Sequence, residues 1–451
     1  MNHHGVKTVP FSGSGDWGGL ATWGQQGFWD GLKRYDCTSW YRNVAPVWTV
    51  PEGWVLADVL QMLGSTVSRY EGLRTDVREG EDGRLRQHVC GRGEFPVEII
   101  EATNETDLAG HVARLRALPL IGNGKLPFAA AVVVEEGRPR QMIWAISHLA
   151  VDASSVRVLL SHLDAPRQEP PPQPRDRAEL EAGDQLAQAA ERSTTAWLRA
   201  LAGADLPFAA RRPEPDAGGI LQETLTSRSA ATRLEELTAA LGTDASAVLL
   251  AAVSVALGSP LGLRTLPLQV VTSNRHRSGT EDYLGVLAQL GPMAVGLDPD
   301  QKFGDAVGQV RRRSLRAYSS ALWSPAALDS TLRGTGRSAD EVLGATYTFN
   351  DVRGGFPAVM DHPAQPDPGK DYAVRPLPWW PYQGGRCGIA VAGDQEVLQF
   401  AVRADTAYVA PELARSLLPA IDTVLRLAHA NSADVLVGEL AAAIRGELAD
   451  H

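Results

Sequence analysis

The chain has 451 residues, of which 44% are hydrophobic and 21% charged, and its length predicts two globular domains or lobes. A net charge of −10 argues against a nucleic-acid-binding protein, and three scattered cysteines predict a reducing compartment and no metal site. We find neither an apolar leader nor 18 consecutive apolar residues, so we expect a cytoplasmic monomer without a membrane span.

The first twenty residues are polar and rich in glycine, and we predict a loop there. Gly13, Gly15 and Gly18 formally match the G-x-G-x-x-G dinucleotide fingerprint. That fingerprint requires a strand before it and a helix directly after it. Pro10 precedes the match and Gly19 follows it, so we interpret the pattern as part of the loop.

The rest of the first half alternates between helical and strand patterns. Apolar residues recur at helical spacing in three segments, and they alternate or run together in three others. Helices are predicted at residues 23–32, 55–67 and 108–118, and strands at residues 85–89, 129–134 and 141–146. The last two strands flank a charged turn, so we predict a hairpin whose second strand leads to His148.

A run of prolines then changes the composition abruptly. Five prolines between residues 165 and 176 predict a stiff extended linker, which a helix at residues 180–201 follows. More prolines stand at positions 207, 213 and 215. We place the lobe boundary here, with an N-terminal lobe of residues 1–204 and a C-terminal lobe of residues 205–451.

The second half repeats the alternation of helices and strands. Helices are predicted at residues 230–241, 245–257, 303–318 and 413–427, and strands at residues 266–271, 342–349, 388–392 and 397–402. Gly242 and Asp244 have the chemistry of a C-cap and an N-cap. We interpret four arginines of the 303–318 helix as a solvated face rather than a docking patch. Both halves therefore predict an α/β (α+β) fold.

The stretch that organises the chain runs from Ala145 to Ser155. A buried strand ends at its start, and a helix that Asp152, Ser154 or Ser155 could cap begins at its end. His148 is thus held by a sheet on one side and can open onto a cleft on the other. A neutral imidazole there could accept a proton near neutral pH, although the same pattern also fits a histidine with a purely structural role.

The motif Ser147-His148-x-x-x-Asp152-Ala153 resembles the H-H-x-x-x-D-G signature of nonribosomal peptide synthetase condensation domains and of their acyltransferase relatives. Other blocks resemble that family in the expected order. T-W-G-Q-Q-G-F-W at residues 22–29 is similar to S-x-A-Q-x-R-L-W, and S-R-Y-E-G-L-R-T at residues 68–75 is similar to R-H-E-x-L-R-T. Further similarities lie at residues 272–275 (T-S-N-R), 283–295 and 349–350 (F-N).

The resemblance implies a chloramphenicol acetyltransferase-like fold, in which two lobes form a V around a central tunnel. It also implies a free-standing enzyme of natural-product (nonribosomal peptide type) biosynthesis. Such an enzyme transfers an acyl or aminoacyl group from a carrier-protein thioester to an amine or alcohol acceptor. The substrate would arrive on the phosphopantetheine arm of an acyl or peptidyl carrier protein, and we expect no bound cofactor. Direct transfer of the acyl group, without a covalent intermediate on the protein, fits a chain that has no G-x-S-x-G nucleophile motif.

By the same resemblance, His148 is the base or positioning group and Asp152 is structural. Asp152 should pair with Arg275, and Asn350 completes the expected catalytic set. Substrate-binding residues are expected on both sides of the tunnel: Ser147, Ala153, Ser273, Asn274, Trp379 and Trp380. The Ser147 hydroxyl could hold an acceptor or bond to its own backbone. The two tryptophans could line a tunnel mouth or pack between the lobes.

Three departures from the family pattern keep another function open. Ser147 replaces the first histidine of the signature, Ala153 replaces its glycine, and the late D-F-G-W-G block is absent. The alternative is a non-catalytic condensation-like scaffold that recruits tailoring enzymes to a carrier-bound peptide. An epimerase would require a further acidic residue that we do not locate.

Overall fold

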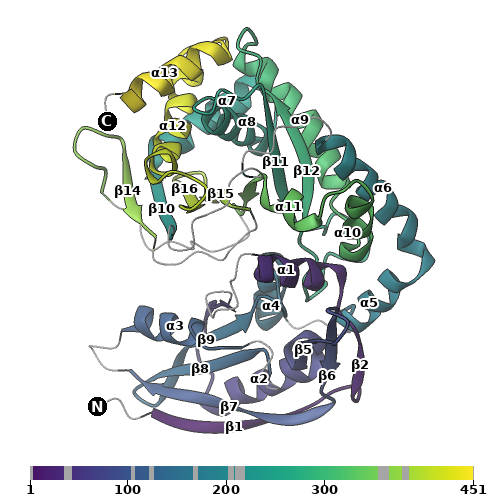
Figure 1. Ribbon diagram of the computed structural model, residues 1–451. Helices are drawn as coiled ribbons and strands as arrows, with labels where there is room; N and C mark the ends of the chain where they lie inside the picture. Colours follow the sequence, from purple (N-terminus) through teal and green to yellow (C-terminus); the bar gives the residue numbers. More distant parts are fainter. Residues whose placement is uncertain are drawn as a thin grey trace. The chain divides into compact units, whose positions relative to one another are not determined.

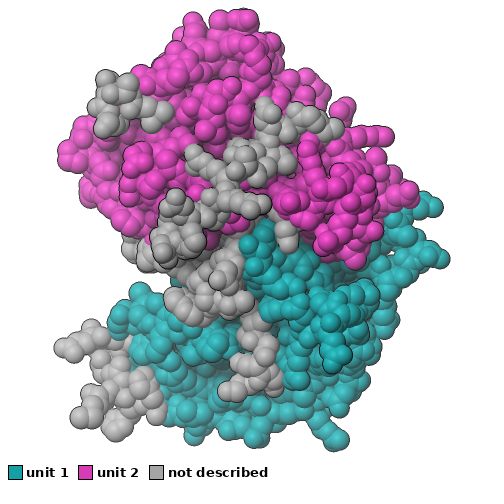
Figure 2. All heavy atoms as spheres, viewed as in Figure 1, with its two compact units in different colours: residues 1–188, 273–288 teal, residues 189–272, 289–451 magenta. Residues whose placement is uncertain are grey.

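The chain forms two compact units in this computed structural model, and Figure 2 colours them separately. Unit 1 comprises residues 1–188 and 273–288, and unit 2 comprises residues 189–272 and 289–451. The structure describes residues 4–34, 43–102, 107–120, 126–165, 171–201, 208, 219–353, 365–377 and 385–449.

This division differs from the predicted boundary between residues 204 and 205. It falls within a helix at residues 188 and 189, and residues 273–288 belong to unit 1 although their neighbours in sequence belong to unit 2. The physical reason is a set of buried polar contacts between residues 273–288 and the rest of unit 1, which are described below. The two compact units therefore divide earlier in the chain than the position predicted from the prolines at 207, 213 and 215.

Unit 1 is built on a six-stranded sheet with the order β1-β7-β8-β9-β3, in which β4 also pairs with β9 (Figure 1). Its strands are β1 (His4–Ser12), β3 (Asn43–Val44), β4 (Val47–Thr49), β7 (Arg92–Glu101), β8 (Phe128–Glu135) and β9 (Arg138–Ser147). A second sheet joins β2 (Trp17–Leu20), β5 (Thr75–Glu79) and β6 (Leu85–Val89). The predicted hairpin is confirmed as the antiparallel pair β8 and β9.

The helices of unit 1 include those predicted around the His148 stretch. They are α1 (Trp23–Arg34), α2 (Leu56–Arg69), the 3-10 helix η1 (Glu71–Arg74), α3 (Leu108–Arg116), α4 (Ala153–Asp164) and α5 (Pro174–Ala182), and α6 (Asp184–Leu201) runs on into unit 2. The predicted linker was wrong at its end, because Pro174 starts α5 at the first helical position, where proline is well tolerated. The predicted helix at residues 180–201 is divided at Gly183.

The predicted N-terminal loop was also wrong, because β1 and β2 occupy most of it. β1 pairs with β7 over nine residues at the edge of the sheet. Within β1, the alternation of buried apolar residues that is typical of a strand is limited to Val9 and Phe11. No helix follows the three glycines directly, since Gly18 lies in β2. The interpretation that they are not a dinucleotide fingerprint is confirmed.

Unit 2 is built on a seven-stranded sheet with the order β12-β11-β13-β15-β16-β10-β14. Its strands are β10 (Ile220–Ser227), β11 (Thr265–Thr272), β12 (Gln289–Gly296), β13 (Tyr347–Asp351), β14 (Tyr372–Pro376), β15 (Cys387–Gly393) and β16 (Leu398–Asp405). Its further helices are α7 (Arg228–Leu241), α8 (Ala245–Gly258), α9 (Phe303–Ser319), α10 (Pro325–Gly334), α11 (Ala339–Gly344), α12 (Pro411–Ala430) and α13 (Val437–Ala449). The strand predicted at residues 342–349 was wrong in its first half, where α11 forms instead.

Helices α7, α8 and α12 pack together over the apolar face of this sheet (Figure 1). All side chains of α8 from residue 247 to residue 258 are buried, which explains why that helix is apolar on every side. Among the described helices, none alone is long and apolar enough to cross a membrane. The sharply bent pair of α7 and α8 satisfies the criterion only when the two are taken together.

Candidate functional site

His148 stands directly after β9, which ends at Ser147, and four residues before Asp152, the N-cap of α4. β9 is held on both sides, by β8 along its length and by β3 and β4 at the opposite edge. The predicted position at the end of a buried strand and before a helix is therefore confirmed. His148 is half-buried, whereas the residues on either side of it are fully buried.

Backbone hydrogen bonds fix the loop that carries His148. The carbonyl oxygen of Ser147 accepts from the N–H of Ala150 at 2.9 Å and of Val151 at 3.2 Å. The Ser147 hydroxyl accepts from the N–H of Leu149 at 3.2 Å, and the Leu149 carbonyl accepts from Gln25 Nε2 at 3.0 Å. The Ser147 side chain is 1% exposed, so its hydroxyl serves the fold of its own loop.

The imidazole itself is covered on one side by an aromatic ring. Phe28 of α1 stacks on His148 with ring centroids 4.6 Å apart and an interplanar angle of 22°. The sequence reasoning missed Phe28 and Gln25 as neighbours of His148. The T-W-G-Q-Q-G-F-W block was noticed, but a motif does not reveal which of its side chains faces a histidine 120 residues away.

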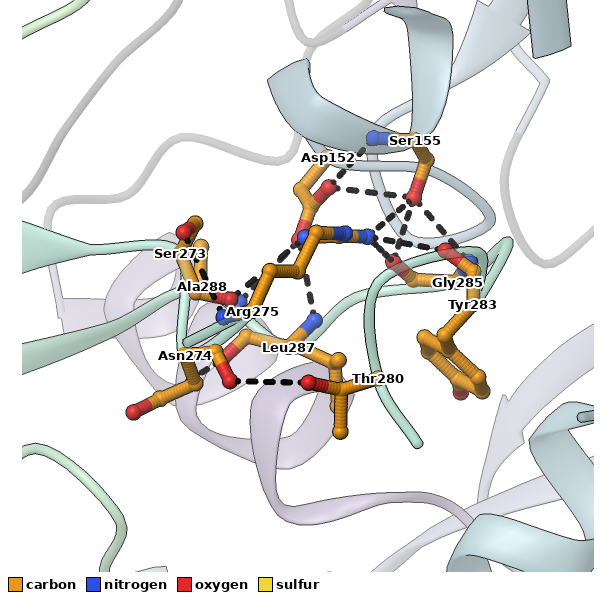
Figure 3. Close-up of polar contacts among 10 residues, drawn as sticks. All are labelled: Asp152, Ser155, Ser273, Asn274, Arg275, Thr280, Tyr283, Gly285, Leu287 and Ala288. Atoms are coloured by element: carbon orange, nitrogen blue, oxygen red, sulfur yellow. Dashed lines mark hydrogen bonds and ion pairs between the residues drawn. The ribbon is translucent and has the colours of Figure 1, made fainter. Parts of the chain in front are cut away.

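Asp152 is the centre of a buried network (Figure 3). Its Oδ2 accepts from Arg275 Nη1 at 2.8 Å and from the backbone N–H groups of Leu287 and Ala288 at 3.0 and 3.1 Å. Its Oδ1 accepts from the N–H of Ser155 at 2.8 Å, which caps α4, and from the Ser155 hydroxyl at 3.0 Å. The ion pair of Asp152 and Arg275, which the family resemblance implied, is confirmed.

These contacts decide the charge of Asp152. Burial alone raises the pKa of this carboxyl group, but the positive charge of Arg275 and the hydrogen bonds from Arg275, Leu287 and Ser155 together hold the pKa below its usual range. Asp152 is therefore ionised at neutral pH, and both its oxygens are engaged. It can orient its surroundings, but it is poorly placed to accept a proton from a substrate.

Ser155 links α4 to the segment that carries Arg275. Its hydroxyl lies 2.6 Å from the carbonyl oxygen of Gly285 and accepts from the Gly285 N–H at 3.0 Å and from Arg275 Nη2 at 2.8 Å. Arg275 Nη2 also donates to the carbonyl oxygen of Tyr283 at 3.0 Å. The sequence reasoning considered Ser155 only as a helix cap, because its partners are 120 and 130 residues away.

Asn274 shapes the start of the same segment. Its φ of 56° lies in the left-handed region, which asparagine tolerates better than most residues. Its side-chain amide donates to the carbonyl oxygen of Leu287 at 2.9 Å, and its own carbonyl oxygen accepts from Thr280 Oγ1 at 3.2 Å. Asn274 is 1% exposed, so its contacts support a structural role more than the predicted contact with substrate.

The structure gathers some of the remaining predicted residues in unit 1. Ala153 is the first residue of α4 and is half-buried, and Ser273 is half-buried beside Arg275. Asn350 lies in β13 of unit 2, where its side chain is 7% exposed. Trp379 and Trp380 lie outside the described residues.

The block at residues 68–75 holds a second buried charge cluster. Glu71 and Arg74 are 1% and 2% exposed, and their charged atoms approach to 3.6 Å. The Glu71 carboxylate also accepts from Ser14 Oγ at 2.8 Å and lies 3.3 Å from Arg175 Nη2. Arg74 donates to the carbonyl oxygen of Cys90 at 2.8 Å. These contacts tie four chain segments together, so this motif is structural.

No group of three or more His, Cys, Asp or Glu side chains in the described part of the chain is arranged to hold a metal ion. The described side chains at the site are a half-buried imidazole on a rigid loop and an ionised, fully engaged carboxylate beside it. Such a group can move a proton or orient a nucleophile.

Comparison with known proteins identifies the class. The family model described as "Condensation domain" matches residues 22–349, so the chain belongs to the condensation-domain family. The fold is accordingly the predicted chloramphenicol acetyltransferase-like α/β fold. A search of curated proteins found no match.

Three solved structures illustrate the range of similar proteins. One is the condensation domain of the enacyloxin polyketide synthase that mediates chain release, with 21% identity, a TM-score of 0.66 and coverage of 89% of this chain and 82% of that one. Another is the SgcC5 protein of Streptomyces globisporus, with 19% identity, a TM-score of 0.64 and coverage of 88% and 94%. The third is the X-domain of teicoplanin biosynthesis, solved in complex with OxyB, with 18% identity, a TM-score of 0.65 and coverage of 91% and 94%. At these identities, they show the fold alone.

Proposed function

We propose that this protein is a condensation enzyme, which transfers an acyl or aminoacyl group from a carrier-protein thioester to an amine or alcohol. His148 would accept the proton of the attacking nucleophile or hold that nucleophile in place. The observation that carries the proposal is the rigid presentation of a half-buried imidazole at the end of β9, within a chain of the condensation-domain family.

The roles of the other residues follow from their contacts. Asp152 and Arg275 would fix the loop, because both carboxylate oxygens of Asp152 and both terminal nitrogens of Arg275 are bonded within unit 1. An enzyme gains rate by holding its catalytic group in position before the substrate binds. Hydrolysis of a thioester competes with transfer, so exclusion of water from the site would favour the acceptor.

The substrate would be presented on the phosphopantetheine arm of an acyl or peptidyl carrier protein, with a small amine or alcohol as acceptor. Transfer requires that these two reactants reach His148 from different directions. Asn350, Trp379 and Trp380 remain predicted contributors from the second half of the chain. The proposal requires neither a metal nor a bound cofactor.

The alternative is a scaffold that recruits a tailoring enzyme. It draws support from the complex of the similar X-domain with OxyB, and from Ser147 and Ala153 at two signature positions. In this chain, however, the Ser147 hydroxyl bonds to the loop that carries His148, and Ala153 starts α4 without disturbing the Asp152 cap. Both departures therefore leave a well-ordered histidine loop, which favours the enzyme.

The test is an intact-mass assay. Carrier proteins loaded with acetyl, aminoacyl or peptidyl groups are incubated with an amine and alcohol pool, with and without the protein. We expect loss of the acyl group from one loaded carrier and a condensed product in the small-molecule fraction. His148→Ala should abolish the product, whereas His88→Ala, which removes an exposed histidine from β6, should keep wild-type turnover. Product formation at the wild-type rate by His148→Ala would contradict the catalytic role.

A further inference from the structure

The backbone around His148 is held on both sides, so the orientation of its ring is decided by the groups that contact the ring. Ser147 bonds to three N–H groups of the loop, and Gln25 bonds to the Leu149 carbonyl. A side-chain ring can turn about its own bonds unless the groups that contact it prevent this. The direction in which its nitrogens point therefore depends on what lies against the ring.

Phe28 lies against it. The two rings are nearly parallel at 22°, and their centroids are 4.6 Å apart, which is a stacked arrangement. Phe28 covers one face of the imidazole, so a turn of the imidazole out of the stack would clash with the phenyl ring or break the contact. A reactant cannot approach the imidazole through the face that Phe28 covers.

The phenyl ring is itself a fixed surface, because α1 is anchored at several points. The N–H of Trp23 donates to Glu181 Oε2 at 2.5 Å, at the start of the helix. Gln26 Oε1 accepts from the N–H of Leu85 at 2.7 Å. Phe28 packs against the buried cluster of Val77, Leu85 and Leu149. The anchored position of α1 therefore fixes where the phenyl ring lies against the imidazole.

In the opening block that residues 22–29 resemble, S-x-A-Q-x-R-L-W, the position of Phe28 is a leucine. A leucine side chain can fill space beside an imidazole, but it offers no flat face to define the plane of the ring. The same chain carries Ser147 where the signature has a histidine.

We infer that Phe28 is a positioning residue, which sets the plane of the His148 imidazole. The plane of the ring in turn sets the direction in which its nitrogen atoms face the nucleophile. The inference rests on the proposed function in one respect, namely the acyl transfer for which the imidazole is oriented. The orientation of the ring is a property of the full-length protein that can be measured without substrate.

The experiment combines NMR of ring-labelled histidine with steady-state kinetics. The His148 ring signals are assigned by their loss in His148→Gln. The phenyl ring should shift them upfield in the wild type; Phe28→Leu and Phe28→Met should remove that shift, and Phe28→Tyr should keep it. Trp29→Leu is the matched control, because Trp29 belongs to the same helix and packs against the same cluster without stacking on His148.

In the carrier assay, Phe28→Leu should lower kcat by about tenfold or more with the acceptor KM unchanged, and Phe28→Tyr should restore kcat, as expected for lost orientation. His148 signals that are the same in Phe28→Leu and the wild type would overturn the inference, and so would unchanged kcat and KM. Inactivity of the wild type with every donor would count against the proposed function alone, and the ring signals would still decide the role of Phe28.

Discussion

Asp152 and Arg275 are the residues on which the site depends most, because each is almost fully buried and carries a full charge. Their side chains are 3% and 5% exposed. A buried ion of this kind is tolerated only when its partner and its hydrogen bonds replace the water it has lost. Here the replacement is complete for Asp152, which accepts five hydrogen bonds.

We predict that Arg275→Met lowers the free energy of unfolding by about 3–5 kcal/mol, because it leaves the Asp152 carboxylate buried without its cation. Chemical denaturation of unit 1 monitored by its tryptophans measures the change. Arg86→Met is the control, since it breaks an exposed pair with Asp82 and should change the stability by less than about 1 kcal/mol.

The pH dependence of the unfolding free energy is a second test of the ion pair between Asp152 and Arg275. The pKa of Asp152 is lowered on folding, so its contribution is present above the unfolded value of about 3.9 and is lost as the pH falls through the folded value. The difference between the wild type and Arg275→Met should therefore shrink in acid. A difference that is constant from pH 7 down to pH 3 would contradict this account.

At this scale, the sequence predicted the charged residues better than their neighbours. His148, Asp152 and Arg275 could be selected because their motif positions and charges demand partners. Gln25, Phe28 and Ser155 could not, because an amide, an aromatic ring and a hydroxyl are common in every fold. Their importance comes from partners more than 100 residues away, which no local pattern reveals.

At the scale of elements, the connection between α7 and α8 shows where sequence is most informative. Gly242 ends α7 with a φ of 54°, and Asp244 caps α8 by accepting from the N–H of Ala247 at 2.9 Å. Both were predicted from residue type, because caps depend on local chemistry. Edge strands such as β1 and the short β14 were missed, because strand pairing is set by distant partners rather than by the strand's own residues.

Two glycine substitutions should have opposite effects. Gly242→Ala forces an alanine into the left-handed region and should destabilise the protein by about 1 kcal/mol. Gly446→Ala lies on an exposed part of α13 with open space around its Cα, and it should stabilise the protein by about 0.5–1 kcal/mol. Thermal denaturation of both variants checks the signs. Equal shifts in the same direction would mean that backbone conformation is not the cause.

For the whole molecule, the decisive feature is the excursion of residues 273–288. The chain leaves the unit 2 sheet at the end of β11, contributes these residues to unit 1, and returns as β12, the antiparallel partner of β11. Composition and proline content predicted two lobes, but they could not predict a crossing that depends on one buried arginine and a few backbone groups.

We predict that replacing residues 273–288 with a Gly/Ser linker of equal length destabilises unit 1 and leaves the unit 2 sheet formed. Hydrogen exchange should show lost protection in α4, because Asp152 and Ser155 at the start of α4 bond to the replaced segment. Protection should be retained in β11 and β12, because these two strands pair with each other. Loss of protection in both places would show instead that the two units unfold together.

The excursion also sets an order of events during synthesis. The ribosome synthesises the first 188 residues of unit 1 well before residue 275. Asp152 of the nascent chain therefore lacks its ion-pair partner Arg275 until more than 120 intervening residues have been made. Domains usually fold in sequence as they emerge. Here unit 1 can be completed only after residues 189–272 of unit 2 have been made, so the loop that carries His148 gains its full set of contacts only once residues 273–288 have been synthesised.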